Sequence, residues 1–368
     1  MMRSIQVFRA LKELKEPAVL ATLVGVVGSS YRKPGARLLL TAAGAQAGNI
    51  SAGCMETDVQ ARVQGVLATR QPTLVTYNLG IELDLVWGTG MGCEGQAEIL
   101  LEPIQPGRLA PWVHFCSQQL ERRRTCALAT VVATRGEVAF TLGDRFSYDD
   151  RNHGLLPIDA TLSIELGRAC ALVRESGKPI RQVFQVPGGD VDLLVEPLFP
   201  PTALWIFGAG EHARILARLA GQLGWAVGIL DHRPALATTE RFPEAEVVRA
   251  GHPVETMADL RLDARSAAVV LSHVYAKDKE ALGFFLNSGA GFVGLQGNRK
   301  RSEKMLTELA ADGFPLTDAM RDQLYFPVGL DLGAEAPEGI ALSILAEVQA
   351  VLAGRSGGHL RDRQAPIH

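Results

Sequence analysis

The chain has 368 residues, enough for two or three domains with sizeable cores. Hydrophobic residues make up 47% of it, which excludes a disordered protein, and the formal net charge of −3 supplies no overall basic field for binding nucleic acid. No apolar stretch reaches the roughly 20 residues that span a bilayer, and no signal-peptide core stands at the N-terminus. We therefore expect a cytoplasmic protein with neither nucleic acid nor a membrane as its partner.

The first 198 residues predict one composite region of mixed helices and strands. Apolar residues at helical spacing indicate a short helix over residues 4–15, and an uninterrupted apolar run indicates a buried strand over residues 18–27. Polar, glycine-containing turns follow at residues 28–35 and 48–54. The second of these turns leads into a predicted helix from about residue 55 to residue 67.

A faint repeat occurs within this region. Leu20–Val24 and Leu128–Val132 have nearly the same sequence, and a glycine follows each of them six residues past the threonine. Coincidence would explain the similarity. Equivalent strands in two halves of one sheet, about residues 1–105 and 106–198, would explain it as well.

A proline-rich stretch, Glu196–Pro201, predicts a stiff linker to a second region over residues 199–353. This region opens with an apolar strand, Ala203–Phe207, a glycine turn, Gly208–Ala213, and an amphipathic helix. A second strand then ends at Asp231, so the segment reads as a strand–helix–strand unit of a parallel sheet.

The arrangement predicts a nucleotide-like ligand. Backbone amides at Gly208, Ala209 and Gly210 and the start of the helix can approach a diphosphate. Asp231, 23 residues after the first glycine, can accept a hydrogen bond from a ribose hydroxyl, which favours NAD over NADP, whereas Arg233 is suited to a phosphate. A turn with a purely structural role is the alternative.

The alternation of strands and helices continues after Asp231 and predicts a doubly wound parallel sheet. Ligands of such sheets bind at the carboxyl ends of the strands, so we expect Ser272 and His273, at the end of the fourth strand, to line the same crevice as Gly210. The tail, residues 354–368, is rich in Gly, Arg and Pro and is expected to be disordered. The further strands are predicted at residues 246–249, 267–272 and 292–295.

The cysteines are odd in number and lack Cys-x-x-Cys spacing, which argues against a disulfide framework or a structural zinc site. We expect reduced thiols. The five are Cys54, Cys93, Cys116, Cys126 and Cys170.

Cys54 stands between a glycine turn and a predicted helix, where free amides and the helix dipole stabilise a thiolate or a bound anion. Glu56 and Asp58 oppose this effect because they repel a thiolate, and Arg32 could offset them. The alternative is that Cys54 is a small buried packing residue. Cys93, within a glycine-dense stretch, has the same two interpretations.

Several separate motifs resemble those of the xanthine dehydrogenase accessory factor (XdhC/CoxI) family, in the same order and over about residues 1–353. They lie at residues 28–36, 51–56, 92–95, 206–210, 231–234, 240–243, 272–273, 327–334 and 337–344.

The chain also departs from the pattern of that family. Ala52 and Glu94 stand where the family has glycines, and Gly339 stands where it has a glutamate. Glu211 and His212 replace a His-Val pair, and a carboxylate at residue 211 would repel a diphosphate.

The resemblance implies a protein that binds molybdenum cofactor (molybdopterin), supports its sulfuration with a cysteine desulfurase, and delivers it to the apoenzyme of a molybdenum hydroxylase. We expect no catalytic turnover of its own, and a homodimer. The pterin phosphate would rest on the Ser51–Cys54 amides, and Cys54 would be a soft thiolate ligand of molybdenum. The expected cofactor-binding residues of this region are Ser29, Ser30, Arg32, Ser51, Gly53, Cys54, Glu56 and Cys93.

Two other functions stay open. Gly208, Gly210 and Asp231 suit an NAD(P)-dependent oxidoreductase, or a protein that binds another nucleotide. Glu211 suits a scaffold whose nucleotide site is vestigial.

Overall fold

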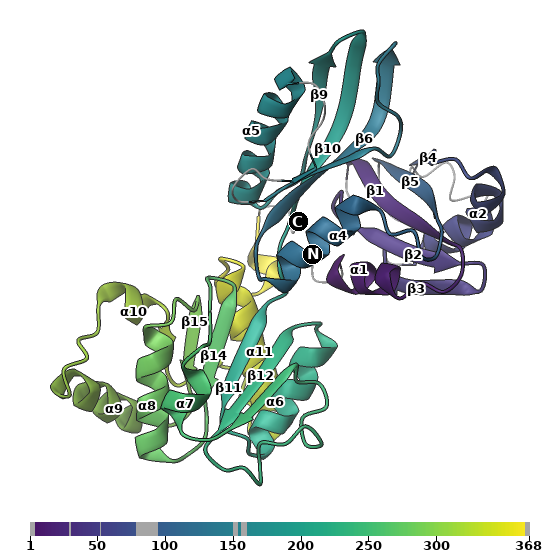
Figure 1. Ribbon diagram of the computed structural model, residues 1–368. Coiled ribbons are helices and arrows are strands. Elements are labelled where there is room, and N and C mark those ends of the chain that lie inside the picture. The colour runs from purple at the N-terminus through teal and green to yellow at the C-terminus, as the bar shows by residue number, and fades with distance from the viewer. Residues whose placement is uncertain are drawn as a thin grey trace. The chain divides into compact units, whose positions relative to one another are not determined.

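The computed structural model describes the chain except residues 1–3, 29–30, 52, 79–94, 150–153, 156–159 and 365–368. The chain divides into two compact parts, which we call unit 1, Met1–Pro200, and unit 2, Pro201–His368 (Figure 1). The division falls in the proline-rich stretch, but Glu196 to Leu198 are the last residues of a strand rather than part of a linker.

Unit 1 contains two five-stranded antiparallel sheets of the same topology. The first has the order β3-β2-β1-β5-β4 and the second the order β8-β7-β6-β10-β9. The strands of the first sheet are β1 (Ala18–Gly28), β2 (Arg37–Thr41), β3 (Gly44–Gly48), β4 (Thr73–Asn78) and β5 (Gly95–Ile104). Those of the second are β6 (Cys126–Gly136), β7 (Arg145–Tyr148), β8 (Gly154–Leu155), β9 (Ile180–Val186) and β10 (Gly189–Leu198).

Each sheet buries one face under a helix. Helix α2 (Glu56–Thr69) covers the first sheet through Val59 and Val63, and α5 (Ala160–Ser176) covers the second through Leu162 and Leu166. Two further helices, α1 (Ser4–Lys12) and α4 (Pro111–Glu121), share one core with residues of both sheets. Apolar burial of this kind is the main source of folding free energy, so unit 1 is held together by cores within and between its halves.

The repeated sequence corresponds to the two central strands. Leu20–Val24 lies in β1 and Leu128–Val132 in β6, and each strand has a bulge at its valine, Val24 or Val132. The expectation of a single sheet is wrong, because the two segments are the middles of two separate sheets.

Two buried ion pairs connect the halves in a reciprocal way. The Arg37 guanidinium in β2 donates to Glu196 in β10, and the Arg145 guanidinium in β7 donates to Glu102 in β5. The arginine side chains are 0% and 3% exposed. Each also lies over an aromatic ring, Arg37 over Phe8 at 5.8 Å and Arg145 over Trp112 at 4.4 Å.

Unit 2 is a six-stranded parallel sheet in the order β13-β12-β11-β14-β15-β16, which confirms the predicted doubly wound fold. The sixth strand was not predicted because two residues are too few to show a periodic pattern. The strands are β11 (Ala203–Phe207), β12 (Ala226–Asp231), β13 (Val247–Ala250), β14 (Ser266–Val270), β15 (Phe292–Leu295) and β16 (Leu324–Tyr325). The helices are α6 (Glu211–Gln222), α7 (Pro253–Met257), α8 (Tyr275–Leu286), α9 (Arg299–Ala311), α10 (Asp318–Asp322) and α11 (Pro337–Leu352).

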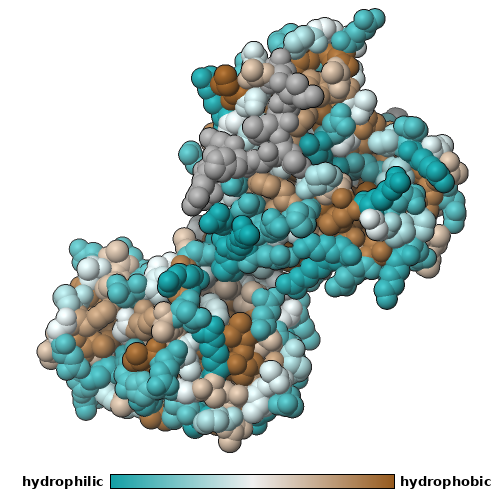
Figure 2. Space-filling view, in the orientation of Figure 1, coloured by the Kyte–Doolittle hydropathy of each residue, from teal (hydrophilic) through white to brown (hydrophobic). Residues whose placement is uncertain are grey.

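The core of unit 2 lies between the sheet and its helices, with Val270 and Leu295 packed against Phe285 and Met305. Hydrophilic side chains cover much of the face seen in Figure 2, with apolar patches among them. Within the described residues, no helix has the length and apolar character needed to cross a bilayer. The described part of the tail contains a short 3₁₀ helix, Leu360–Asp362, and its expected disorder stays a prediction.

Candidate functional site

The turn before α2 folds around the carboxylate of Glu56. One oxygen, Oε1, accepts hydrogen bonds from the backbone N–H groups of Ser51 (2.8 Å) and Ile50 (3.2 Å). The other, Oε2, accepts from the Gly53 N–H (3.1 Å) and from the Ser51 hydroxyl. Ser51 Oγ in turn accepts from the N–H of Met55 at 3.2 Å. Ser51, Gly53, Cys54 and Glu56 are thus brought together in one turn, as predicted.

Glu56 is an anion held in a nest of donors. Burial raises its pKa, but the hydrogen bonds from the side chain and backbone of Ser51 and from Ile50 outweigh burial, so the pKa lies below the ordinary 4.5. The amides were predicted to receive a pterin phosphate. They do form an anion site, but the anion in it belongs to the chain, and a phosphate would have to displace Glu56.

Cys54 is a free thiol and is exposed, so the alternative in which it is a buried packing residue is wrong. Gly53, directly before it, has φ +110°, a conformation that side chains with a Cβ rarely adopt, and open space lies beside its Cα. The turn therefore presents the thiol toward solvent. By contrast, Cys116, Cys126 and Cys170 are buried.

The second carboxylate of this helix start, Asp58, is also engaged. Its Oδ2 accepts from Arg62 Nε at 2.7 Å and from the Tyr77 hydroxyl at 2.5 Å. Burial raises the pKa of Asp58, but the hydrogen bonds from Arg62 and Tyr77 lower it by more. The charge of Asp58 is shared with Arg62, which reduces its repulsion of a thiolate at Cys54.

Arg32, expected in the same site, is half-buried in the loop after β1. Ser29, Ser30 and Cys93 lie outside the described residues.

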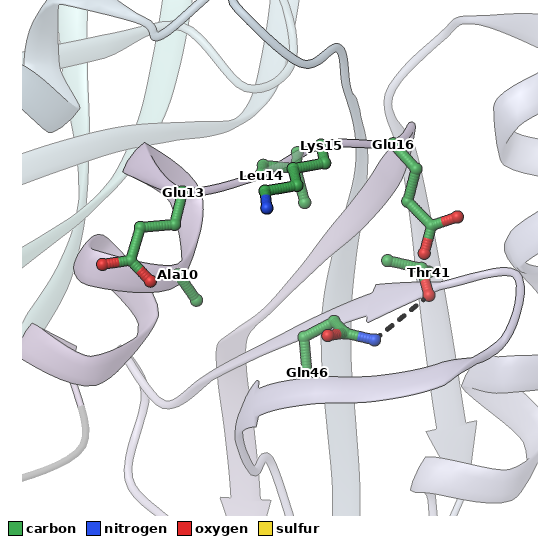
Figure 3. A pocket seen from close by; sticks show the side chains of 7 residues that line it. All are labelled: Ala10, Glu13, Leu14, Lys15, Glu16, Thr41 and Gln46. Carbon is green, nitrogen blue, oxygen red and sulfur yellow. Dashed lines mark hydrogen bonds between the residues drawn. The ribbon is translucent and has the colours of Figure 1, made fainter.

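A pocket of about 460 Å³ lies elsewhere in unit 1, between α1, the segment that follows it, and β2 and β3 (Figure 3). The Gln46 amide donates to Thr41 Oγ1 at 3.3 Å on one wall. None of the predicted site residues lines this pocket, which holds mixed acidic, basic and apolar side chains. They are Ala10, Glu13, Leu14, Lys15, Glu16, Thr41 and Gln46.

In unit 2 the two glycines of the turn after β11 have different roles. Gly208 has φ +122°, and a Cβ there would lie 2.7 Å from the backbone nitrogen of Ser272, so this glycine permits close packing on the end of β14. Gly210 is the N-cap of α6, and a Cβ there would meet nothing within 4 Å. No side chain caps α6, which leaves space and free amides at its start.

Asp231 and Arg233, both predicted to contact a ligand, contact each other. The Asp231 carboxylate is fully buried and accepts from Arg233 through its backbone N–H (2.8 Å), Nε (2.9 Å) and Nη2 (2.7 Å). It also accepts from the Ala209 N–H at 2.5 Å. Burial raises the pKa of Asp231, but these hydrogen bonds hold it below 3.8. A ribose hydroxyl would have to replace Arg233 to reach this carboxylate.

Ser272 and His273 lie at the carboxyl edge of the sheet, as expected, beside a carboxylate that the sequence did not single out. Ser272 Oγ donates to Asp278 Oδ1 at 2.6 Å, and Arg301 Nη2 donates to Asp278 Oδ2 at 2.7 Å. Asp278 is fully buried in the first turn of α8. Its place six residues after a strand-end serine was the available signal.

Glu211, which was expected to repel a diphosphate, is exposed and pairs with Arg214 one turn along α6 at 2.5 Å. The hydrogen bond from Arg214 lowers the pKa of Glu211. Part of the negative charge at the start of α6 is thereby offset.

Comparison with known proteins places this architecture. Residues 11–78 match the XdhC and CoxI family, and residues 204–348 match the XdhC Rossmann domain. A protein of Bacillus subtilis described as a probable xanthine dehydrogenase component is 30% identical over 341 residues, which cover 92% of this chain and 94% of that protein. The uncharacterized protein YqeB of Escherichia coli is 28% identical over 171 residues, 46% of this chain and 31% of that one.

A crystal structure of a xanthine dehydrogenase from Bacillus halodurans is similar throughout, with a TM-score of 0.75, 27% sequence identity and 96% of both chains covered. The fold and the turn with its exposed thiol thus define a two-unit protein that combines a duplicated antiparallel region with a Rossmann domain. The chain belongs to the XdhC and CoxI family, the xanthine dehydrogenase accessory factors.

Proposed function

We propose that this protein binds molybdenum cofactor as cargo and hands it to the apoenzyme of a molybdenum hydroxylase such as xanthine dehydrogenase. The observation that carries the proposal is the exposed thiol of Cys54, presented by a turn that Glu56 holds in shape. A thiolate is a soft ligand suited to a sulfur-bound metal centre. A solvent-facing thiol can also release its ligand to a docked partner, whereas a buried one would retain it.

The contacts of Glu56 refine the role of the turn. Because the amides of Ile50, Ser51 and Gly53 donate to Glu56, the turn positions Cys54, and the pterin phosphate is better served by a cation such as Arg32. The proposal extends to sulfuration of the cargo by a cysteine desulfurase, and to a homodimer.

Transfer of cofactor tests the proposal directly. Protein purified from a molybdenum-replete host and loaded with cofactor should restore activity to a cofactor-free xanthine dehydrogenase in proportion to the molybdenum transferred. Cys54→Ser protein should retain at least tenfold less cofactor, which corresponds to about 1.4 kcal/mol. Cys170→Ala is the matched control, since this thiol is buried in unit 1. Equal retention by Cys54→Ser and the original protein would disprove the role of the thiol.

Nucleotide binding in unit 2 is a second candidate, favoured by the space at Gly210 and the uncapped start of α6. Calorimetry with NAD, NADP, ATP and CTP tests it. Binding together with turnover of NADH would indicate an oxidoreductase. Absence of heat with all four would leave unit 2 as a scaffold.

A further inference from the structure

Two imidazole rings lie at the carboxyl edge of the unit 2 sheet. His212 comes from the first turn of α6 and His273 from the segment after β14, and their ring centroids are 6.2 Å apart with the planes at 76°. The nucleotide and cofactor proposals above use neither ring as a ligand to a metal ion.

His273 is held in an uncommon backbone conformation, with φ +65°. The other described non-glycine residues with positive φ, Arg70 and Arg123, follow the ends of helices, where this conformation is ordinary. His273 instead follows a strand. Strain of this kind persists where the surroundings impose it and is found at functional sites.

The surroundings that impose it are the hydrogen bonds of its neighbour. Ser272 is tied to Asp278 through both its backbone N–H (3.1 Å) and its hydroxyl (2.6 Å). Asp278 is fixed in turn by Arg301, whose other terminal nitrogen reaches the carbonyl oxygen of Gln296 at 3.5 Å. These contacts join the ends of β14 and β15 and fix the point from which the His273 ring projects.

The His212 ring is oriented by Gln296. Its Nδ1 lies 3.1 Å from the Gln296 side-chain amide, and Gln296 Oε1 is buried with no hydrogen-bond partner among the described residues. Rotating this amide by half a turn lets Oε1 accept from Nδ1–H, which satisfies the buried oxygen. His212 Nε2 then carries a lone pair, and a histidine that donates its other N–H to an amide carbonyl has the arrangement typical of metal ligands.

The distance between the rings fits a shared metal ion. With metal–nitrogen bonds of about 2.0–2.1 Å, two imidazoles on a tetrahedral ion have centroids about 5.2 Å apart, and about 6.2 Å at a wider angle. His273 is exposed and can close the difference by a small rotation of its side chain.

We propose that His212 and His273 bind a divalent transition-metal ion of the kind that prefers imidazole, such as Zn²⁺, Ni²⁺ or Co²⁺. Among the described residues no group of three His, Cys, Asp or Glu side chains is placed to hold a metal, so these two rings are the protein ligands. Water or an anionic small molecule completes the coordination. Affinity is therefore in the micromolar range, and the open positions make the ion a docking point for such a molecule.

The test is titration of the metal-free full chain with Co²⁺, followed by calorimetry and by the visible absorption of bound Co²⁺. Cys54 and Cys93 are replaced by Ser in every variant, since thiolates would bind the same ion. One Co²⁺ should bind per chain, and His212→Ala and His273→Asn should each weaken binding at least tenfold. Asparagine tolerates positive φ, so His273→Asn removes the ring and keeps the backbone.

His114→Asn is the matched control, because this exposed histidine lies in α4 of unit 1 and contacts only Gln118. It should leave Co²⁺ binding unchanged, and unfolding curves should show all variants folded. Binding that is absent from the starting protein, or unaltered in both His212→Ala and His273→Asn, overturns the proposal. Neither result bears on cofactor retention by Cys54, which is measured separately in unit 1.

Discussion

Glu56 illustrates how one side chain can define a turn that the sequence pattern only outlines. Its carboxylate fills positions on backbone amides that were predicted for a phosphate. The residue types and their order pointed correctly to an anion site beside Cys54. They could not show that the anion is supplied five residues after Ser51, because this depends on the path of the backbone between the two.

Replacing Glu56 with Gln should lower the free energy of unfolding by about 1.5–3 kcal/mol, the range for hydrogen bonds to a charged group. The amide keeps the shape of the side chain but accepts at only one of its two terminal atoms. Urea unfolding at pH 7 measures the change. Thr57→Ser, at an exposed neighbouring position, is the control and should have little effect. An unchanged midpoint for Glu56→Gln would mean that the turn does not depend on this carboxylate.

The same variant should show a distinct pH dependence. The pKa of Glu56 is lowered in the folded protein, so its contribution to stability is present above the unfolded value near 4.5 and is lost as the pH falls through the folded value. The difference in stability between the original protein and Glu56→Gln should therefore shrink below about pH 4.5. Chemical unfolding at a series of pH values checks this, and a constant difference would contradict it.

Asp231→Asn is expected to act mainly on the stability of unit 2. The carboxylate is fully buried against Arg233 and the Ala209 amide, and breaking a buried charge pair costs about 3–5 kcal/mol. Thermal unfolding of the variant measures the loss, with Glu211→Gln as an exposed control. A variant of unchanged stability would indicate that Asp231 is free to bind a ligand, as the sequence pattern suggests.

At the scale of elements, the regular parts of the chain were predicted well. Ala203–Phe207 and Phe292–Leu295 are strands with the predicted bounds, because apolar runs between turns leave few alternatives. Helix α8 begins four residues earlier than predicted, since its N-cap, Val274, has no capping side chain that would mark the start. The separation of unit 1 into two sheets could not be predicted, because strand pairing is set by contacts distant in sequence.

The ion pairs between the halves of unit 1 give an element-scale prediction. Arg37→Met alone should lower the free energy of unfolding of unit 1 by about 3–5 kcal/mol, since it leaves Glu196 buried without its partner. The double variant Arg37→Met with Glu196→Leu should recover most of the loss. Urea unfolding of both variants provides the comparison. If the double variant is no more stable than Arg37→Met, the pair does not act as a unit.

At the scale of the whole molecule, each unit has its own core, so each should fold alone. Residues 1–200 and 201–368, expressed separately, should each unfold cooperatively. The first should retain molybdenum cofactor, and the second should retain Co²⁺ binding. Calorimetric unfolding and metal analysis of the two pieces test this, and a unit 1 piece that folds but retains no cofactor would show that the cargo site needs both units.

The reciprocal exchange of charges in unit 1 also constrains how its halves can be inherited. Each half buries a glutamate and an arginine whose counter-charges the other half supplies, so neither is electrically complete by itself. A break in the backbone between β5 and α4 should leave two fragments that are insoluble apart and reassemble when they are produced in one cell. The second copy of the duplication thus persists as an obligatory complement of the first, even where it presents no thiol of its own to solvent among the described residues.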